Sequence, residues 1–304
     1  MGCAQQYVMA NLKEIRTRRE SVASTRQITS AMKMVSAAKL KKAQNAIVQL
    51  RPYAEKLQEI LGSISGSMQD DDENVYARAC DEQSVLLVLI TSNRGLCGAF
   101  NSNAIKASIH SALETYSDQM MAGKVHFIAL GKKGFDFLTR NGYNVIFNGS
   151  DIFDELTFEK SMIISEMVMK LYMEEEYDHV DIVYNQFKNA GTQILTNEQF
   201  LPIKMDNMDE EEQITAHNVD YIFEPSKEYI VKELIPRSLK LEFHKALLDS
   251  HAAEHGARMT AMHKATDNAT EMMKELALEY NKARQATITN EIIEIVGGAE
   301  ALRG

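Results

Sequence analysis

The two ends of the chain are long runs with almost no helix-breaking residues. No Gly or Pro interrupts Ala10–Arg51, and Tyr53–Ile64 resumes the helical pattern directly after Pro52. After Pro236, the run Arg237–Val296 contains no proline and one glycine, and we expect Gly297 and Gly298 to stop it. At 1.5 Å per residue, helices of these lengths span about 60 and about 90 Å. Such long polar helices need a partner for their narrow apolar stripes.

The stripe of the last helix is built from small side chains. Its members recur every three or four residues: Ala246, Ser250, Ala253, Ala257, Ala261 and Ala265. Small residues let two helix backbones approach closely. On the first helix, a matching seam is predicted at Ile28, Met32, Val35, Ala46 and Leu50. Because Lys39 and Lys42 interrupt that seam, both a coiled coil and a looser helix pair stay open. Chain order makes the pair antiparallel, with both termini at its far end.

The pattern between the two ends is that of an α/β domain. The apolar runs Ser84–Thr91, Val125–Leu130 and Val180–Tyr184 predict buried parallel strands. Helical patterns lie at Asn103–Met121, Lys133–Asn141 and Phe158–Glu176, and edge strands are expected at Gln199–Lys204 and Tyr221–Phe223. Strands alternating with helices indicate a mostly parallel, Rossmann-like sheet covered on both faces.

The predicted fold class is therefore α/β plus a long antiparallel two-helix coiled coil. We divide the sequence into an extension (1–8), with Met9 an alternative translation start, a first coiled-coil helix (9–66), an acidic linker (67–83), the α/β domain (84–225, with an acidic loop at Asp206–Gln213) and a last coiled-coil helix (226–304).

Charge is distributed unevenly along the chain. The net charge is -10, yet Asn11–Lys56 carries eleven Lys and Arg against three Glu, a local balance of +8. A basic helix on an acidic protein suits nucleic acid, a membrane surface or an acidic protein partner, and a solvated face is the plain alternative. No apolar run reaches the roughly 20 residues of a membrane span, and no secretory signal is evident, so a cytosolic location is expected. Cys80 and Cys97 flank a strand that would hold them roughly 20 Å apart, so we expect no disulfide between them.

No motif in the sequence predicts catalysis, a cofactor or a metal. The turn Thr91–Phe100 (TSNRGLCGAF) follows a strand, as phosphate-binding loops do, but it matches neither common glycine pattern. We expect Gly95 and Gly98 to make a tight turn and Asn101 or Ser102 to cap the next helix. His251 and His255 have the spacing of a zinc pair, but Ala252 stands where the general base would be, which favours ordinary surface histidines.

Three blocks resemble one family. Ile28–Gln44 (ITSAMKMVSAAKLKKAQ), Met259–Ala269 (MTAMHKATDNA) and Ile288–Ala301 (ITNEIIEIVGGAEA) are similar to the helices of the F-type ATP synthase gamma subunit family, of bacterial type. The turn Asn93–Phe100 (NRGLCGAF) is similar to the family's first βα loop. The resemblance covers Met9–Leu302. It departs from the family pattern in the extension and in the two acidic segments.

The resemblance implies a function as a rotor shaft without catalytic, cofactor or metal sites of its own. The implied partners are three alpha and three beta subunits, the epsilon subunit and the membrane c ring, with neither nucleic-acid binding nor direct membrane insertion. The implied location is peripheral, on the cytoplasmic face of the bacterial inner membrane. Candidate contacts with the alpha/beta ring are Met32, Lys33, Val35, Arg258, Met259, Lys264, Asp267, Asn268, Asn290, Glu291 and Glu294. For each of these, packing within the helix pair or a solvated face is the alternative. The competing function is a nucleotide- or nucleic-acid-binding α/β protein with a basic coiled coil.

Overall fold

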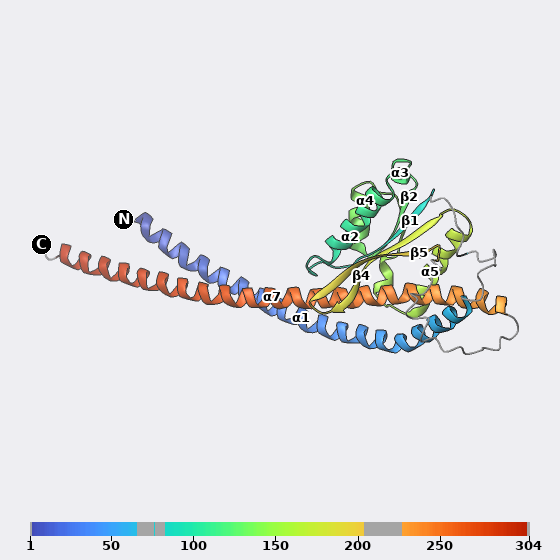
Figure 1. The fold of residues 1–304 in the computed structure, drawn as a ribbon. Coiled ribbons are helices and arrows are strands. Elements are labelled where there is room, and N and C mark those ends of the chain that lie inside the picture. Colours follow the sequence, from blue (N-terminus) through green and yellow to red (C-terminus); the bar gives the residue numbers. More distant parts are fainter. Residues whose placement is uncertain (1, 66–75, 77–82, 204–226, 303–304) are drawn as a thin grey trace. The chain divides into compact units, whose positions relative to one another are not determined.

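The long terminal helices exceed their predicted bounds. The computed structural model describes residues 2–65, 76, 83–203 and 227–302. Helix α1 runs from Gly2 to Ser65 through Pro52, and α7 runs from Lys227 to Ala301 through Pro236 (Figure 1). The prediction that Gly297 and Gly298 end the last helix was wrong. Neither glycine adopts a positive φ, and each costs an exposed helix only about 1 kcal/mol relative to Ala.

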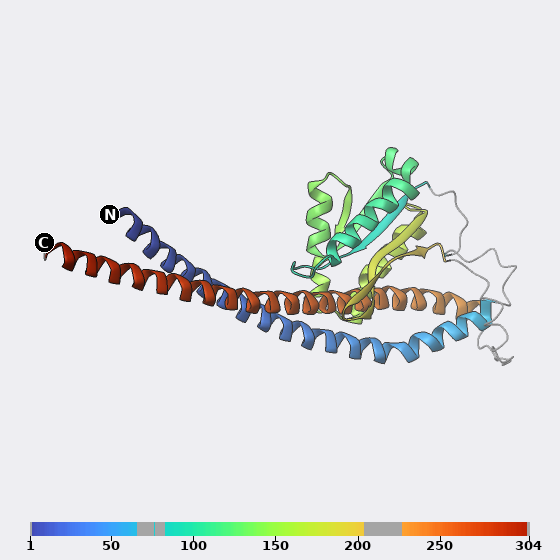
Figure 2. The ribbon, with the colours of Figure 1, turned by 60° about the vertical axis from the view of Figure 1, so that its left-hand side comes forward.

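The chain forms two compact units. One comprises Met1–Val35 and Met259–Gly304, and the other comprises Ser36–Arg258. Both long helices contribute to both units. In the first, here called the helix-pair unit, α1 and α7 run alongside each other in both views (Figures 1 and 2). The second, here called the sheet unit, contains all the strands.

The buried seam of α1 differs from the predicted seam by about one residue. Ile28 and Val35 are 58% and 57% exposed, so their assignment to the seam was wrong. Over the predicted seam, Ile28 to Leu50, the buried positions are Thr29, Ser36, Leu40 and Ala43. One residue corresponds to about 100° around a helix, so this offset exchanges an inner face for an outer one. Lys39 and Lys42 are exposed and do not interrupt the buried positions.

A five-stranded sheet forms the centre of the sheet unit. Its order is β3-β2-β1-β4-β5. The strands are β1 (Val85–Ile90), β2 (Val125–Leu130), β3 (Val145–Asn148), β4 (His179–Asn189) and β5 (Thr192–Leu201). Strands β1 to β4 are parallel, and β5 pairs antiparallel with β4. The mostly parallel, Rossmann-like prediction is confirmed.

Alternate residues of β1 face two different cores. Leu86, Val88 and Ile90 pack in one cluster that includes residues of α5 (Phe158–Met173) and α7. Val85, Leu87 and Leu89 pack in another, with residues of α2 (Phe100–His110) and α4 (Lys132–Arg140). Helices therefore cover both faces, which explains why β1 is apolar along its whole length (Figure 1).

The small-residue stripe of α7 packs partly against the sheet unit's own core. Ala246 lies in the core cluster shared with α5, and Ala253 packs with Cys97 and Phe100. The prediction had placed these alanines against the first helix. A stripe of small residues indicates a close approach, but it does not identify the element that approaches.

Several local elements also differ from the sequence prediction. The helix expected at Asn103–Met121 is divided into α2, a π-helical turn η2 (Ser111–Thr115) and α3 (Ser117–Met121). Strand β3 and the 3₁₀ turn η3 (Ser150–Phe153) were not predicted, and β5 begins seven residues earlier than the edge strand expected at Gln199. The strand expected at Tyr221–Phe223, the acidic loop at 206–213 and Cys80 lie outside the described residues.

Across the described ranges, no helix combines the length and the apolar character that a membrane crossing requires.

Candidate partner-binding surface of the helix pair

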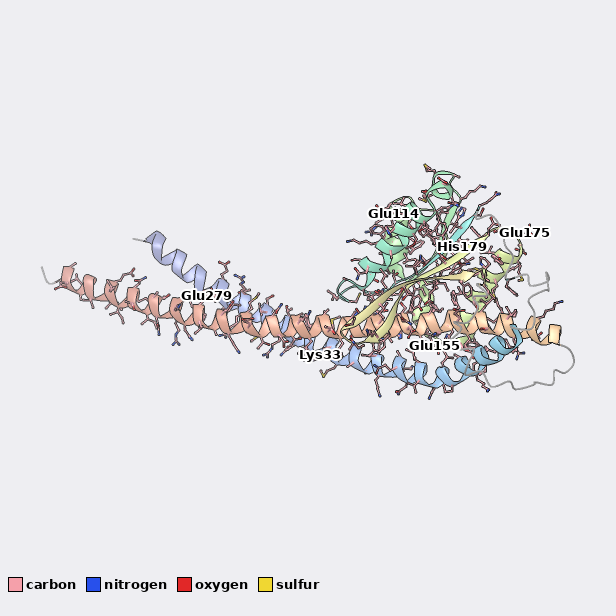
Figure 3. The ribbon with its side chains drawn as sticks, viewed as in Figure 1. Lys33, Glu114, Glu155, Glu175, His179 and Glu279 are labelled. Atoms are coloured by element: carbon pink, nitrogen blue, oxygen red, sulfur yellow. The ribbon has the colours of Figure 1, made fainter. Side chains whose placement is uncertain are left out.

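Three contacts set the register of the helix pair. Thr266 donates a hydrogen bond to the Thr29 hydroxyl (2.9 Å), Lys33 Nζ lies 3.2 Å from His263 Nδ1, and the Arg19 guanidinium lies 5.4 Å from the centroid of the Tyr280 ring. Residue numbers rise along α1 as they fall along α7, so the pair is antiparallel, as predicted. Figure 3 labels Lys33 on α1.

The inner face of α7 follows a heptad pattern. Alternating steps of four and three residues keep one narrow face of a helix against its partner. Among the buried or half-buried residues of α7 in this unit, eight recur at these steps: Met262, Thr266, Ala269, Met273, Leu276, Tyr280, Ala283 and Thr287. The other faces of α7 in this unit carry mostly exposed residues, with half-buried residues that include Ala261, Ala265, Thr270 and Ala277.

Most of the predicted ring contacts lie on those outer faces. Met32, Lys33 and Met259 are half-buried, whereas the other candidates in the helix-pair unit are exposed: Val35, Lys264, Asp267, Asn268, Asn290, Glu291 and Glu294. Asp267 Oδ2 lies 3.4 Å from His263 Nδ1, the same imidazole nitrogen that Lys33 approaches. The structure thus brings Lys33 and Asp267 together around His263 and leaves Asn290, Glu291 and Glu294 on the last turns of α7.

The apolar side chains on those last turns were not predicted as a surface. Ile288, Ile292 and Ile295 are 46%, 55% and 71% exposed, and Ile293 and Val296 are exposed as well. Among them, Ile288, Ile292 and Ile295 recur at steps of four and three, so they share one face of the helix. That spacing is readable in the sequence, but it was attributed to the family signature rather than to a surface. We call Ile288, Ile292, Ile293, Ile295 and Val296 the apolar tip.

Arg258 differs from the other candidates because it is buried in the sheet unit. It is 7% exposed, and its Nη2 donates to the backbone oxygens of Arg94 (2.9 Å) and Gly95 (3.3 Å). Its Nη1 contacts Glu254 and lies 3.3 Å from His255 Nδ1. These contacts favour the alternative of packing within the chain for this residue.

The surroundings of Arg258 contain two neutral histidines. The pKa of His251 is lowered to about 4 and that of His255 to about 3, mainly by burial and in part by the positive charges of Arg258 and Lys39. Their Nε2 atoms lie 3.1 Å apart. Because Arg258 donates to His255 Nδ1, the proton of His255 resides on Nε2 and is donated to His251. Burial also raises the pKa of Glu254, although Arg258 opposes that change.

This histidine pair is structural rather than the surface pair expected from the sequence. His255 is 5% exposed, and His251 stacks on Phe153 with 6.2 Å between ring centroids. Among the residues the structure describes, no group of three or more His, Cys, Asp or Glu is placed to hold a metal ion.

The turn after β1 uses its polar groups internally. The amides that begin α4 are bonded within the chain: Lys132 to the Asn93 side chain (3.0 Å), Lys133 to the Ser92 carbonyl (3.1 Å) and Gly134 to the Thr91 hydroxyl (2.9 Å). A helix start binds phosphate through free amides, and these three are not free.

Chain order reverses between β1 and β4, where open parallel sheets commonly bind nucleotides. At the carboxyl end of β1, Cys97 and Phe100 pack against Ala253 of α7. The Asn101 side chain accepts a hydrogen bond from the Ser92 amide (2.9 Å). Helix α2 begins at Phe100 without a side-chain cap, so Asn101 and Ser102 both lie inside it and the prediction that one of them caps this helix was wrong. These contacts weigh against the nucleotide-binding reading.

Comparisons with known proteins agree with this geometry. A family model described as ATP synthase matches residues 11–302. The ATP synthase gamma chain of Christiangramia forsetii is 55% identical over 296 residues, covering 97% of this chain and 100% of the relative. That of Cytophaga hutchinsonii is 54% identical over 294 residues, covering 97% and 99%.

Solved structures share the fold. A chain of the Tetrahymena thermophila mitochondrial ATP synthase, from its central stalk and c-ring, is 26% identical with a TM-score of 0.56, covering 78% of this chain and 99% of that one. A chain of the Euglena gracilis mitochondrial ATP synthase, from its OSCP, F1 and c-ring assembly, has a TM-score of 0.65 at 22% identity and covers 96% and 95%. The identity over nearly the full length of bacterial relatives, together with two long terminal helices and a five-stranded sheet between them in the sequence, shows that the chain belongs to the ATP synthase gamma-chain family.

Proposed function

We propose that this chain is the central rotor shaft of the F1 sector of a proton-translocating ATP synthase. It transmits torque from the membrane c ring to the catalytic alpha/beta hexamer, and so couples proton flow to ATP synthesis. The observation that carries the proposal is the helix-pair unit. Its two helices pack against each other along one face, and their other faces carry exposed charged and apolar side chains. A shaft that turns within partners requires such outward faces.

The apolar tip supports insertion into a ring of partners. Five large aliphatic side chains within nine residues are exposed, more than a solvated helix end needs. We propose that the tip contacts the alpha/beta ring together with Asn290, Glu291 and Glu294. Nearer the sheet unit in sequence, Met32, Lys33, Val35, Met259, Lys264, Asp267 and Asn268 supply the other contacts. Arg258 is left out because its donors bind the chain's own loop.

The remaining partners and the location follow from the family. The proposed assembly has three alpha and three beta subunits, an epsilon subunit and a c ring, at the cytoplasmic face of the bacterial inner membrane. ATP chemistry belongs to the partners, and this chain is a non-catalytic subunit. Support comes from the bacterial gamma chains it resembles and from the stalk and c-ring assemblies of its structural neighbours.

Proton pumping in inverted membrane vesicles tests the proposal. Vesicles from cells that make this chain should acidify on addition of ATP, and vesicles lacking it should not. A probe fixed to an exposed residue such as Met121 should rotate relative to the immobilised alpha/beta ring during hydrolysis. If pumping persists unchanged without the chain, or if the isolated chain itself binds nucleotide tightly, the proposal is wrong.

A further inference from the structure

Helix α7 is held from two sides where it passes the carboxyl ends of the strands. On one side, Ala253 packs against Cys97 and Phe100 of the turn after β1. On another, Gly256 lies so close to the β4–β5 turn that a Cβ there would lie 3.2 Å from Ala190 Cα and 3.3 Å from its oxygen. We call these two turns the α7 collar. Only a residue without a side chain fits this approach without a shift in backbone.

Arg258 fastens α7 to the collar by hydrogen bonds. Its guanidinium reaches Arg94 O through Nη2 and Gly95 O through both Nη2 and Nε, at 2.9 to 3.4 Å. Glu254, one turn earlier, contacts Nη1 and balances the charge. Two adjacent carbonyls and a carboxylate bind a planar guanidinium in one orientation, which a flexible ammonium would not reproduce.

The collar itself is tied to the sheet. Ser92 Oγ donates to Arg94 O (2.6 Å), the oxygen that Arg258 also binds, and Asn101 binds both the amide and the hydroxyl of Ser92. On β4, Asn185 donates to Phe100 O (3.2 Å). The carbonyls that accept hydrogen bonds from Arg258 therefore belong to a turn that is held in place relative to β1 and β4. Through these carbonyls, Arg258 connects α7 to the sheet.

The positions of these contacts around α7 oppose its rotation. Gly256 and Arg258 are two residues apart, and at about 100° per residue their faces lie about 200° apart. Turning α7 about its own axis would bring a residue with a side chain to the place of Gly256 beside Ala190, and it would move Arg258 away from the carbonyls that its guanidinium binds. Because α7 is one continuous helix from Lys227 to Ala301, torque applied to it at the collar acts on the whole helix.

We propose that Arg258 is the positioning residue that locks the rotational setting of α7 to the sheet unit, and that the collar is where torque passes between the sheet and this helix. The inference rests on the proposed rotor function. It assigns Arg258 an internal role in coupling in place of a contact with the ring.

Arg237 offers a matched control on the same helix. It too pairs with a glutamate four residues earlier, Glu233, at 3.4 Å, but its side chain is 62% exposed. The variants to compare are Arg258→Gln, Arg258→Lys and Arg237→Gln, each in the complete ATP synthase. Because Arg258→Gln leaves Glu254 buried without its cation, the double variant Glu254→Gln/Arg258→Gln separates loss of the lock from loss of folding.

The measurement is the number of protons pumped per ATP hydrolysed in inverted vesicles, with the amount of assembled complex determined in parallel. Arg258→Gln and the double variant should assemble and hydrolyse ATP, but their pumping per ATP should fall by about threefold or more. Pumping per ATP in Arg258→Lys should be intermediate between that of these two variants and that of the parent. Pumping per ATP in Arg237→Gln should equal that of the parent.

The outcomes separate this inference from the proposed function. A parent complex that does not couple hydrolysis to pumping contradicts the rotor function itself. A parent that couples, with Arg258 variants that assemble and couple equally well, contradicts the lock alone. Lower assembly with an unchanged pumping ratio in every Arg258 variant would reduce the residue to a structural role and also contradict the lock.

Discussion

At the scale of single residues, the buried histidine pair links the stability of the sheet unit to pH. The folded pKa values of His251 and His255 are about 4 and about 3, below the ordinary value of about 6.5. As pH falls through 6.5 the unfolded chain gains these protons and the folded chain does not, so stability is lost toward pH 4. For His251 alone the loss is roughly 3 kcal/mol.

We therefore expect the parent chain to lose free energy of unfolding between pH 6.5 and 4, and His251→Gln/His255→Gln to lose much less over that window. Urea unfolding followed by circular dichroism at several pH values measures both. The control is His110→Gln, at an exposed position of α2 in the same unit. Burial raises the pKa of Glu254, and this shift increases the stability of the folded chain as pH falls, opposite to the effect of the histidines. Both chains contain Glu254, so the difference between parent and double variant reports on the histidines. Equal pH slopes for parent and double variant would contradict the assignment.

A second residue-scale prediction concerns the glycine after β2. Gly131 has φ +119°, and a Cβ there would lie 2.1 Å from the Thr91 carbonyl oxygen. Gly142 also has a positive φ, +78°, but nothing lies within 4 Å of its Cβ position. Gly142→Ala should cost about 1 kcal/mol of backbone strain, and Gly131→Ala distinctly more, about 2–4 kcal/mol. Thermal unfolding of the two variants gives the difference. If both variants lose the same stability, the Thr91 backbone can shift to accommodate a Cβ at residue 131 at little cost.

At the scale of elements, the sequence predicted the strands and helices better than their ends and faces. β1 and β2 were predicted because a strand buried on both faces is apolar throughout. β3 was missed because its exposure alternates over only four residues, Val145–Asn148. The seam of α1 was misplaced because its buried positions include Thr29 and Ser36, which a search for large apolar residues passes over. The contacts of Arg258 could not be predicted from the sequence either, because their acceptors are backbone oxygens of residues 163 and 164 positions away along the chain.

The heptad face of α7 can be tested with one buried leucine and a nearby exposed leucine as its control. Leu276 is 3% exposed and Leu278, two residues later, is 64% exposed. Leu276→Ala should cost about 2–4 kcal/mol because it removes buried methyl groups from the seam, whereas Leu278→Ala should cost well under 1 kcal/mol. Urea unfolding monitored by helical circular dichroism measures both. If the two variants lose equal stability, this face of α7 does not pack against α1.

At the scale of the whole molecule, the residues that make internal contacts are distinct from the exposed residues that are available to partners. The sheet unit is held together by its apolar clusters and by Arg258, and the described residues of the helix-pair unit are held together along its seam. The apolar tip belongs to neither set of internal contacts. Sequence patterns alone could not make this separation, because an isoleucine in a seam and an isoleucine on a surface have the same spacing.

Removing residues 288–304 tests that separation directly. Because the side chains at 288–302 are exposed, the shortened chain should keep the melting temperature of the parent within about 2 °C. In the complete ATP synthase, the same change should lower pumping per ATP, since the tip is proposed to contact the alpha/beta ring. The combined substitutions Ile288→Ser, Ile292→Ser and Ile295→Ser should act in the same direction at full length. A passive scaffold would instead show fewer assembled complexes with unchanged pumping per ATP, and that result would contradict a coupling role for the tip.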